Sequence, residues 1–203
     1  MEKQKKKDLY TKNTQIVLAS SSETRQEILR NYSLKFKVRP HKVNEEIFKK
    51  NHIHLSPEQL VMRIAKAKAK SQVKKGSNEI VIGADQILVC KGKLISKAKD
   101  LNEAKEKLMF LSNSTHSLIN AVHIICKEET IWAKTTKASL FMKKIKREEI
   151  ENYVKLNEKT ILKTVGGYKI EEDRMQLLKV NKGSLEDVQG FPISSFMSIL
   201  KEK

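Results

Sequence analysis

The chain has 203 residues, of which 39% are hydrophobic and 32% charged, so it is long enough and apolar enough to bury a core of its own. No apolar run reaches the ~18 residues that a membrane-spanning helix needs. The formal net charge of +17 would suit a polyanion, but most basic residues are lysines interleaved with glutamates, and aromatic residues make up only 5%. Because base readout favours arginine and single strands need aromatic stacking platforms, this composition favours a solvated lysine-rich surface over specific nucleic-acid binding.

The chain begins with a lysine-rich segment, residues 1–13, which is predicted to be a solvated tail because no apolar segment typical of a signal peptide follows it. A short apolar run (QIVLA) is then typical of a strand, and three serines lead into a segment with helical spacing over Glu23–Asn31. Ser20 or Ser22 could cap that helix. Hydroxyls, free amides and Arg25 at a helix start suit an anion, although ordinary helix capping explains the pattern equally well.

A second helix is predicted to start at Pro57, after a serine N-cap, and to run to about Lys74. Its apolar positions recur at the i, i+4, i+7 spacing, and Lys68 falls among them with Val61 and Ala65. A lysine that points inward suits a phosphate or a carboxylate partner. The alternative is a side chain that snorkels to water at the edge of the core.

The clearest strand is Ile80–Cys90, which is apolar almost throughout except for Asp85. Aspartate is a poor strand former, and a buried carboxylate needs a cation, a metal or several hydrogen bonds to compensate it. Gly83 permits a bulge or a close backbone approach two residues earlier. A structural ion pair, or a strand that ends at Ala84, would also explain the pattern.

The remaining elements alternate between helices and strands, which predicts the α/β class. Helices are expected over 100–111, 146–156 and 194–201, and strands over 118–126 and 138–142. Cys90 and Cys126 each end an apolar run and share no metal-ligand spacing, so both are expected to be buried thiols in a reducing compartment. His116 stands alone, and a lone histidine is more often structural than catalytic.

Eight short motifs, taken in their order and spacing, resemble the Maf family of nucleotide pyrophosphatases over about residues 15–200. They are IVLASSSETRQEIL (16–29), VNEE (43–46), IAKAKA (64–69), VIGADQILV (81–89), ISKAKDLNEA (95–104), LSNSTHSL (111–118), VGGYKIE (165–171) and GFPIS (190–194). Each motif alone is weak, but their joint order makes the resemblance specific. The chain departs from the family at Glu23, where proline is usual, at Ala98, again in place of proline, and at 172–174, in place of a glycine-rich turn.

The resemblance implies a mixed twisted sheet with flanking helices, arranged as two lobes around a central cleft in one domain over 14–203. It also implies a cytoplasmic hydrolase of phosphoric anhydride bonds, with a divalent cation, Mg²⁺ or Mn²⁺, as cofactor and a nucleoside triphosphate as substrate. The products would be pyrophosphate and a nucleoside monophosphate. A homodimer is implied as well, with no membrane and no specific nucleic acid among its partners.

The family's motifs, carried over residue by residue, imply a catalytic group formed by Asp85, Glu45 and Lys68. Asp85 and Glu45 would hold the cation, and Asp85 would accept the proton of a metal-activated water that attacks the α-phosphorus in line. Lys68 would stabilise charge that grows on the pyrophosphate leaving group. The resemblance assigns binding of the substrate's phosphates to Ser20, Ser22, Arg25 and Lys97.

Substrate choice depends on Thr24, Gln86 and Glu171, which stand where two branches of the family differ. One branch favours the pyrimidine triphosphates dTTP and UTP, and the other favours 7-methyl-GTP. Gln86 and Glu171 resemble the second branch, and a carboxylate suits the N1–H and the amine of guanine. Thr24 matches neither branch. Two other classes stay open: a basic nucleic-acid-binding protein without catalysis, and an inactive relative that regulates cell division.

Overall fold

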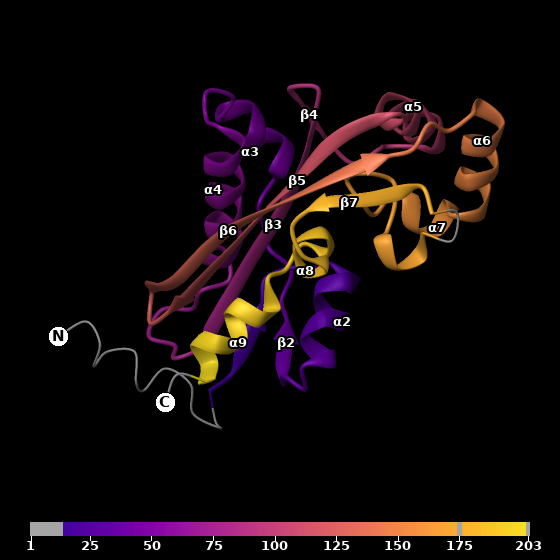
Figure 1. The fold of residues 1–203 in the computed structure, drawn as a ribbon. Coiled ribbons are helices and arrows are strands. Elements are labelled where there is room, and N and C mark those ends of the chain that lie inside the picture. Colours follow the sequence, from indigo (N-terminus) through magenta and orange to yellow (C-terminus); the bar gives the residue numbers. More distant parts are fainter. Residues whose placement is uncertain (1–13, 174–175, 202–203) are drawn as a thin grey trace. The chain divides into compact units, whose positions relative to one another are not determined.

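The computed structural model describes residues 14–173 and 176–201, so the tail expected over 1–13 lies outside the described residues. Helices and strands alternate along this part of the chain (Figure 1), which confirms the α/β class. In the described residues seven strands form one mixed sheet, in the order β2-β1-β3-β5-β6-β7 with β4 paired to β3. The strands are β1 (Ile16–Leu18), β2 (Phe36–Val38), β3 (Ile80–Cys90), β4 (Lys93–Ile95), β5 (Ser114–Cys126), β6 (Glu129–Met142) and β7 (Leu178–Lys182).

The helices are α2 (Glu23–Asn31), α3 (Glu45–Asn51), α4 (Pro57–Lys70), α5 (Leu101–Leu111), α6 (Arg147–Leu156), α7 (Glu158–Ile161), α8 (Leu185–Gln189) and α9 (Ile193–Lys201), with a 3₁₀ turn, η1 (Ile170–Glu172). Two compact units divide the described chain. The first contains residues 14–85, 120–136 and 190–201, and the second contains 86–119 and 137–189 apart from 174–175. These units agree with a two-lobed fold, whereas the central cleft and the assignment of 14–203 to one domain stay predictions.

In the first unit the sheet carries helices on both faces, because its strands are apolar on both sides. β1 pairs in parallel with both β2 and β3. One face packs against α2 and α9 through side chains such as Leu29 and Phe196, and the other packs against α4 through a smaller cluster around Ala69. Figure 1 shows α4 and α2 on opposite sides of these strands.

Gly83 allows β3 and α4 to approach each other at backbone contact. A Cβ atom on Gly83 would lie 2.2 Å from the carbonyl oxygen of Ala65 and 2.5 Å from the amide nitrogen of Ala69. No side chain fits at those distances, so the strand and the helix pack this closely because the residue is glycine. Asp85 follows two residues later on the same face of the strand, and Lys68 precedes Ala69. The close contact therefore brings the two charged side chains together.

The second unit has its own core, in which α5, α6 and α7 pack together with parts of β5 and β6. His116 on β5 is buried in this core, and its Nε2 lies 2.5 Å from the hydroxyl oxygen of Tyr168. Burial lowers the pKa of His116 to about 4, so the ring is neutral at neutral pH. A Cβ atom on Gly166 would lie 2.3 Å from the Tyr168 ring, which explains one glycine of the Gly166-Gly167 pair.

Three element boundaries differ clearly from the expectation, and one of them is the start of β5, which lies at Ser114 rather than at 118. α4 ends at Lys70 rather than near Lys74, because Ser71 Oγ donates to the carbonyl oxygen of Lys68 at 2.8 Å and closes the last turn. β6 begins nine residues before the expected start at 138, since residues 129–137 are mostly exposed and have no apolar pattern.

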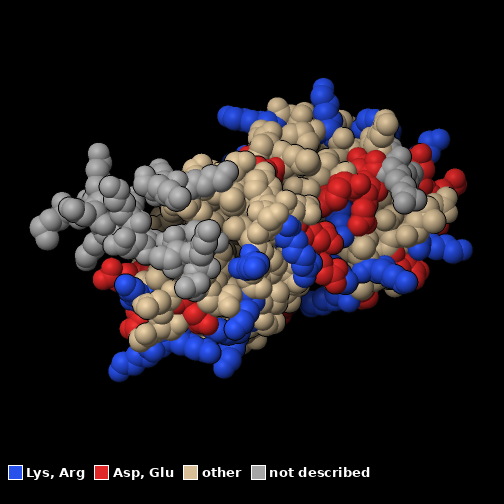
Figure 2. All heavy atoms as spheres, turned by 90° about the horizontal axis from the view of Figure 1, so that it is seen from below, with Lys and Arg blue, Asp and Glu red and all other residues tan. Residues whose placement is uncertain are grey.

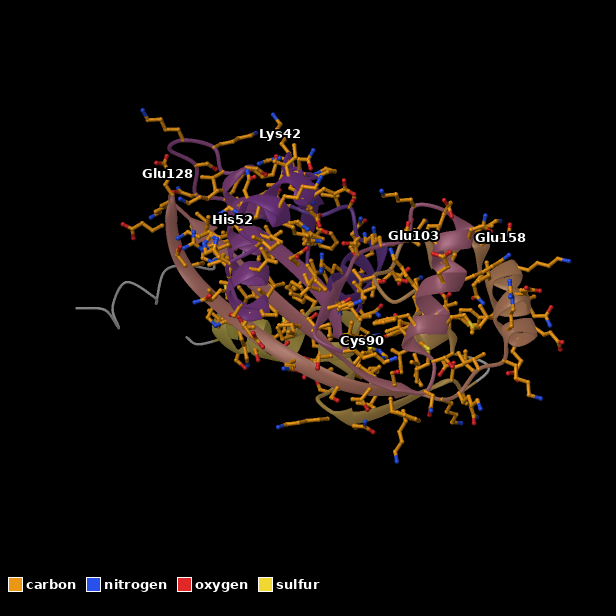
Figure 3. The ribbon with its side chains drawn as sticks, turned by 90° about the horizontal axis from the view of Figure 1, so that it is seen from above. Lys42, His52, Cys90, Glu103, Glu128 and Glu158 are labelled. Carbon is orange, nitrogen blue, oxygen red and sulfur yellow. The ribbon has the colours of Figure 1, made fainter. Side chains whose placement is uncertain are left out.

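The turn between β5 and β6 also lacks a sequence signal. It contains Lys127 and Glu128, which have φ angles of 50° and 66°, and Glu128 is labelled at this turn in Figure 3. Tight hairpins with two positive φ angles favour Asn and Gly. A Lys-Glu pair therefore gave no indication of a hairpin.

The distribution of charged side chains can be followed on one face of the molecule. On the face shown in Figure 2, the described Lys and Arg side chains are scattered among acidic and other residues and form no continuous patch. In 14–173 and 176–201, no helix is long and apolar enough to cross a bilayer. Cys90 and Cys126 are both free and buried, as expected.

Candidate active site

Lys68 lies between two carboxylates in the first unit. Its Nζ is 2.7 Å from Asp85 Oδ1 and 2.7 Å from Glu45 Oε1. Lys68 and Asp85 are each only 3% exposed, so the lysine does not snorkel to water and the aspartate is buried in the strand. The structure thus brings together the three residues that the motifs assign to catalysis. One cationic group faces two anionic groups there.

Asp85 has one oxygen that the lysine does not use. Oδ2 is buried and has no hydrogen-bond partner among the described residues. An unsatisfied buried acceptor costs free energy, so such an atom in a native protein calls for an explanation, and a catalytic role or a bound ion is one. The ion pair with Lys68 gives Asp85 a structural partner, as the alternative explanation required, but it leaves half of the carboxylate available for a proton or a cation.

Glu45 is the first residue of α3, directly after the N-cap Asn44, and its side chain is one-third exposed. Burial by itself raises the pKa of Glu45, but a hydrogen bond with His41 and the charge of Lys68 outweigh it, so the pKa lies well below its usual value. Lys49 Nζ, 3.9 Å from Oε2, acts in the same direction. Glu45 is therefore an anion throughout the physiological range of pH.

The serine loop and α2 place Arg25 close to this group. Ser22 caps α2, and its Oγ accepts the Arg25 amide at 3.4 Å. The Arg25 guanidinium is buried, donating to the Ala84 carbonyl at 3.0 Å and to Ser20 Oγ at 3.4 Å. Burial lowers the pKa of Arg25, and the charges of the two carboxylates, Asp85 and Glu45, oppose that shift, so the guanidinium stays charged.

Capping and anion binding are both compatible with this loop. Ser20 Oγ also accepts the Ser22 amide at 3.2 Å, so these hydroxyls already serve local structure. Thr24 lies half-buried in the first turn of α2. A role of the serines and of Thr24 in binding substrate stays a prediction.

The other predicted site residues belong to the second unit. Gln86 Nε2 donates to the Val188 carbonyl at 2.9 Å, so its amide group is held by the backbone of that unit. Lys97 is exposed in the segment after β4, and its carbonyl accepts a hydrogen bond from Lys107. Glu171 is exposed on η1. That these three side chains meet the same substrate as Asp85 stays a prediction.

Two residues of the cluster were missed by the sequence analysis. His41 Nε2 lies 3.4 Å from Glu45 Oε1, and Lys49 Nζ lies 3.9 Å from Glu45 Oε2. Lys49 is four positions after Glu45 on the same helix, a spacing that joins neighbouring turns. His41 lies in the loop before α3, so no helical spacing relates it to Glu45.

The sequence model of a protein family, described as Maf-like protein, matches residues 15–203 of this chain. Since the match covers nearly the whole chain, this protein belongs to the Maf family, as its motifs indicated.

Curated relatives with different substrate names are similar to this chain over almost their full lengths. A nucleoside triphosphate pyrophosphatase of Ruegeria sp. (strain TM1040) is 34% identical over 93% of this chain and 96% of its own. A 7-methyl-GTP pyrophosphatase of Bartonella henselae is 32% identical over 88% of this chain and 90% of its own. A dTTP/UTP pyrophosphatase of Citrifermentans bemidjiense is 30% identical over 94% of this chain and 96% of its own.

Proposed function

We propose that this protein is a nucleoside triphosphate pyrophosphatase, a hydrolase that cleaves the bond between the α- and β-phosphates. It releases pyrophosphate and a nucleoside monophosphate. Membership of the Maf family and the names of the three relatives support the reaction class. The observation that carries the proposal is the buried Oδ2 of Asp85, which has no partner within 14–173 and 176–201 and lies beside a lysine that joins Asp85 to a second carboxylate.

A divalent cation, Mg²⁺ or Mn²⁺, fits this group of residues. Asp85 Oδ2 is unused, and Glu45 Oε2 lies 3.9 Å from Lys49, beyond hydrogen-bond distance. In the described part of the chain, no three His, Cys, Asp or Glu side chains form a metal cluster, so the protein would supply two carboxylates and substrate and water the rest. Mg²⁺ is commonly bound in this way. When bound, the cation would neutralise phosphate charge and lower the pKa of a coordinated water.

Asp85 accepts the proton in this proposal. Lys68 holds Oδ1 at 2.7 Å, which fixes the orientation of the carboxylate and leaves Oδ2 to take a proton from the attacking water. The water oxygen bonds to the α-phosphorus as the bond from that phosphorus to the bridging oxygen breaks. The electron pair of the broken bond leaves with pyrophosphate.

Positive side chains stabilise the charge that grows on the leaving group. The Arg25 guanidinium donates to the carbonyl groups of Ala84 and Gly190, at 3.0 Å and 3.3 Å, and Ala84 is the residue directly before Asp85. Such pre-oriented charges act in a transition state without reorganisation. We infer the same task for Lys68 and, from the family motif, for Lys97, with Ser20 and Ser22 as further phosphate contacts.

We infer a modified purine such as 7-methyl-GTP as the substrate, on the basis of Gln86 and Glu171. The names of relatives do not decide between branches, since 7-methyl-GTP and dTTP/UTP pyrophosphatases are about equally similar to this chain. An exposed carboxylate at Glu171 can accept two donors from the edge of guanine or attract a methylated, cationic ring. The resemblance also leads us to propose a cytoplasmic homodimer.

Pyrophosphate release from a nucleotide panel tests the proposed function. The panel contains 7-methyl-GTP, GTP, ATP, dTTP and UTP, each with Mg²⁺, with Mn²⁺ and with a chelator. We expect release of equal amounts of pyrophosphate and nucleoside monophosphate, and only with a metal. A nucleic-acid-binding protein would instead bind DNA or RNA with strong salt dependence and release none. An inactive regulator would do neither.

A further inference from the structure

The helix that carries Glu45, α3, has no buried residue that would anchor it in the hydrophobic core. All seven residues of α3 are described, and none of them is buried. The Glu45 side chain is itself 33% exposed. Packing therefore does not fix its carboxylate, and polar contacts must do so if Glu45 is to keep one orientation.

His41 supplies such a contact with a defined tautomer. Its Nδ1 accepts the backbone amide of Val43 at 3.3 Å, and its Nε2 lies 3.4 Å from Glu45 Oε1. A neutral imidazole has one donor and one acceptor nitrogen. The bond from Val43 therefore leaves the proton on Nε2, the nitrogen that faces Glu45.

The loop that carries His41 is tied to the end of α4. The Pro40 carbonyl accepts a hydrogen bond from Gln72 Nε2 at 2.8 Å, and Arg39 Nη1 donates to the Gln72 carbonyl at 2.9 Å. Lys42 is labelled in Figure 3, and its backbone amide donates to Ser71 Oγ at 3.3 Å.

This support is shared with Lys68. Ser71, which receives the loop, also bonds the carbonyl of Lys68 at 2.8 Å. The loop of His41 and the end of α4 are thus joined by hydrogen bonds. His41 from the loop and Lys68 from the helix both contact the same oxygen, Glu45 Oε1.

We propose that His41 is a positioning residue that holds Glu45 Oε1 beside Lys68 and thereby leaves Oε2 directed at the substrate and its cation. This inference rests on the proposed function, because it assigns a task to Glu45 in that reaction. Side chains that hydrogen-bond to a metal-binding residue orient that residue without touching the substrate themselves. Without His41, the partly exposed Glu45 carboxylate keeps only its contacts with Lys68 and Lys49, so its orientation is less restricted.

Three substitutions separate this role from a general structural one. His41→Leu removes the donor, His41→Gln keeps an N–H donor at a comparable reach, and His54→Leu is a matched control on an exposed histidine. We expect His41→Leu to lower kcat/KM for pyrophosphate release by about 10- to 100-fold and to weaken the apparent affinity for Mg²⁺. His41→Gln should recover most of both, and His54→Leu should match the wild type. Equal activity of His41→Leu and His54→Leu, or no recovery in His41→Gln, overturns the inference.

Ring-nitrogen NMR tests the contact without activity. Long-range ¹H–¹⁵N spectra of the metal-free and nucleotide-free protein should show His41 with its proton on Nε2, and this signal should move in Glu45→Gln. A proton on Nδ1, or a His41 ring-nitrogen signal that is the same in Glu45→Gln as in the wild type, overturns the inference. If the wild type releases no pyrophosphate from any nucleotide, the proposed function fails, and these spectra still decide whether His41 holds Glu45.

Discussion

Lys68 Nζ and Asp85 Oδ1 lie 2.7 Å apart, although the residues are 17 positions apart in the sequence and belong to α4 and β3. Both side chains are almost completely buried. Burying an ion pair contributes little net stability, but removing one partner is costly because the other charge is left alone in the interior. The two partners should therefore respond differently to substitution, since Asp85 forms its ion pair with Lys68, whereas Lys68 pairs with two carboxylates.

Asp85→Asn is expected to lower kcat for pyrophosphate release by roughly 100-fold or more while the protein stays folded. The amide has nearly the shape of the carboxylate, and its oxygen can still meet Lys68, but the group no longer accepts a proton. Asp100→Asn is the matched control, because Asp100 caps α5 and asparagine caps a helix equally well. Near-normal turnover of Asp85→Asn, with circular dichroism unchanged, would remove Asp85 from the mechanism.

Lys68→Met is expected to lower the free energy of unfolding by about 3 to 5 kcal/mol, because Asp85 and Glu45 both lose the ammonium group that lies 2.7 Å from each of them. Lys66→Met changes an exposed lysine of the same helix and should stay within about 0.5 kcal/mol of the wild type. Urea unfolding of the three proteins measures the difference. If both variants are equally stable, the central lysine does not compensate the carboxylates.

Gly83→Ala is expected to push α4 away from β3 and to reduce both stability and activity. The new Cβ would meet backbone atoms of Ala65 and Ala69 at 2.2 Å and 2.5 Å, so the helix itself must move, at a cost of about 1 to 3 kcal/mol. Gly76→Ala is the control: its φ of +71° makes alanine strained, but no atom of the described residues lies within 4 Å of the new Cβ. It should lose some stability and keep its activity. Gly83→Ala with wild-type turnover would show that Lys68 and Asp85 do not depend on this contact.

Glu171→Gln is expected to lower kcat/KM for 7-methyl-GTP more than for dTTP, because the neutral amide no longer pairs with two guanine donors or a cationic ring. The neighbouring exposed substitution Glu172→Gln should leave the ratio of the two kcat/KM values unchanged, although it removes the 2.9 Å ion pair with Lys169. The measurement is the specificity ratio in each protein. A ratio that Glu171→Gln does not alter would exclude this residue from the choice of base.

His116 is expected to make the protein less stable in mild acid. Burial lowers its pKa from the ordinary 6.5 to about 4, so between these values the unfolded chain binds a proton that the folded chain does not. Above pH 6.5 both states are neutral at this ring and stability is unaffected. As the pH falls from 6.5 towards 4, the free energy of unfolding should decrease by about 1.4 kcal/mol per pH unit from this group.

His116→Gln should remove that contribution, and urea unfolding at several pH values from 7 to 4.5 compares the slopes. His54→Gln, at an exposed position, should keep the wild-type slope. Parallel curves for His116→Gln and the wild type would mean that the folded protein already carries the proton.

Features with a local cause could be predicted from the residues themselves. The periodicity of α4 placed Lys68 on the apolar side, and the structure shows it buried between exposed Lys66 and Lys70. The apolar run of β3 placed Asp85 in a buried strand. Ser56 and Pro57 marked the start of α4, because caps act through hydrogen bonds within one turn.

The short elements without an apolar run could not be predicted, unlike β1, which is also three residues long. β2 and β4 have three residues each and α3 has seven, which is too few for a periodic pattern, and β2 and β4 are defined by the strands that they pair with. Because α3 was not predicted, Lys49 was not recognised as a partner of Glu45, and His41 lies in a loop that has no periodic pattern.

The sequence by itself therefore determined the chemical groups, their burial and the family to which the chain belongs, because side-chain periodicity and motif order are properties of neighbouring residues. Only the tertiary structure decided that one lysine joins Asp85 to Glu45 at 2.7 Å on each side and leaves Asp85 Oδ2 without a partner among the described residues. Those distances depend on how closely β3 and α4 pack at Gly83 and on how the loop before α3 is tied to α4. Such contacts join residues far apart in the chain, and no local pattern records them.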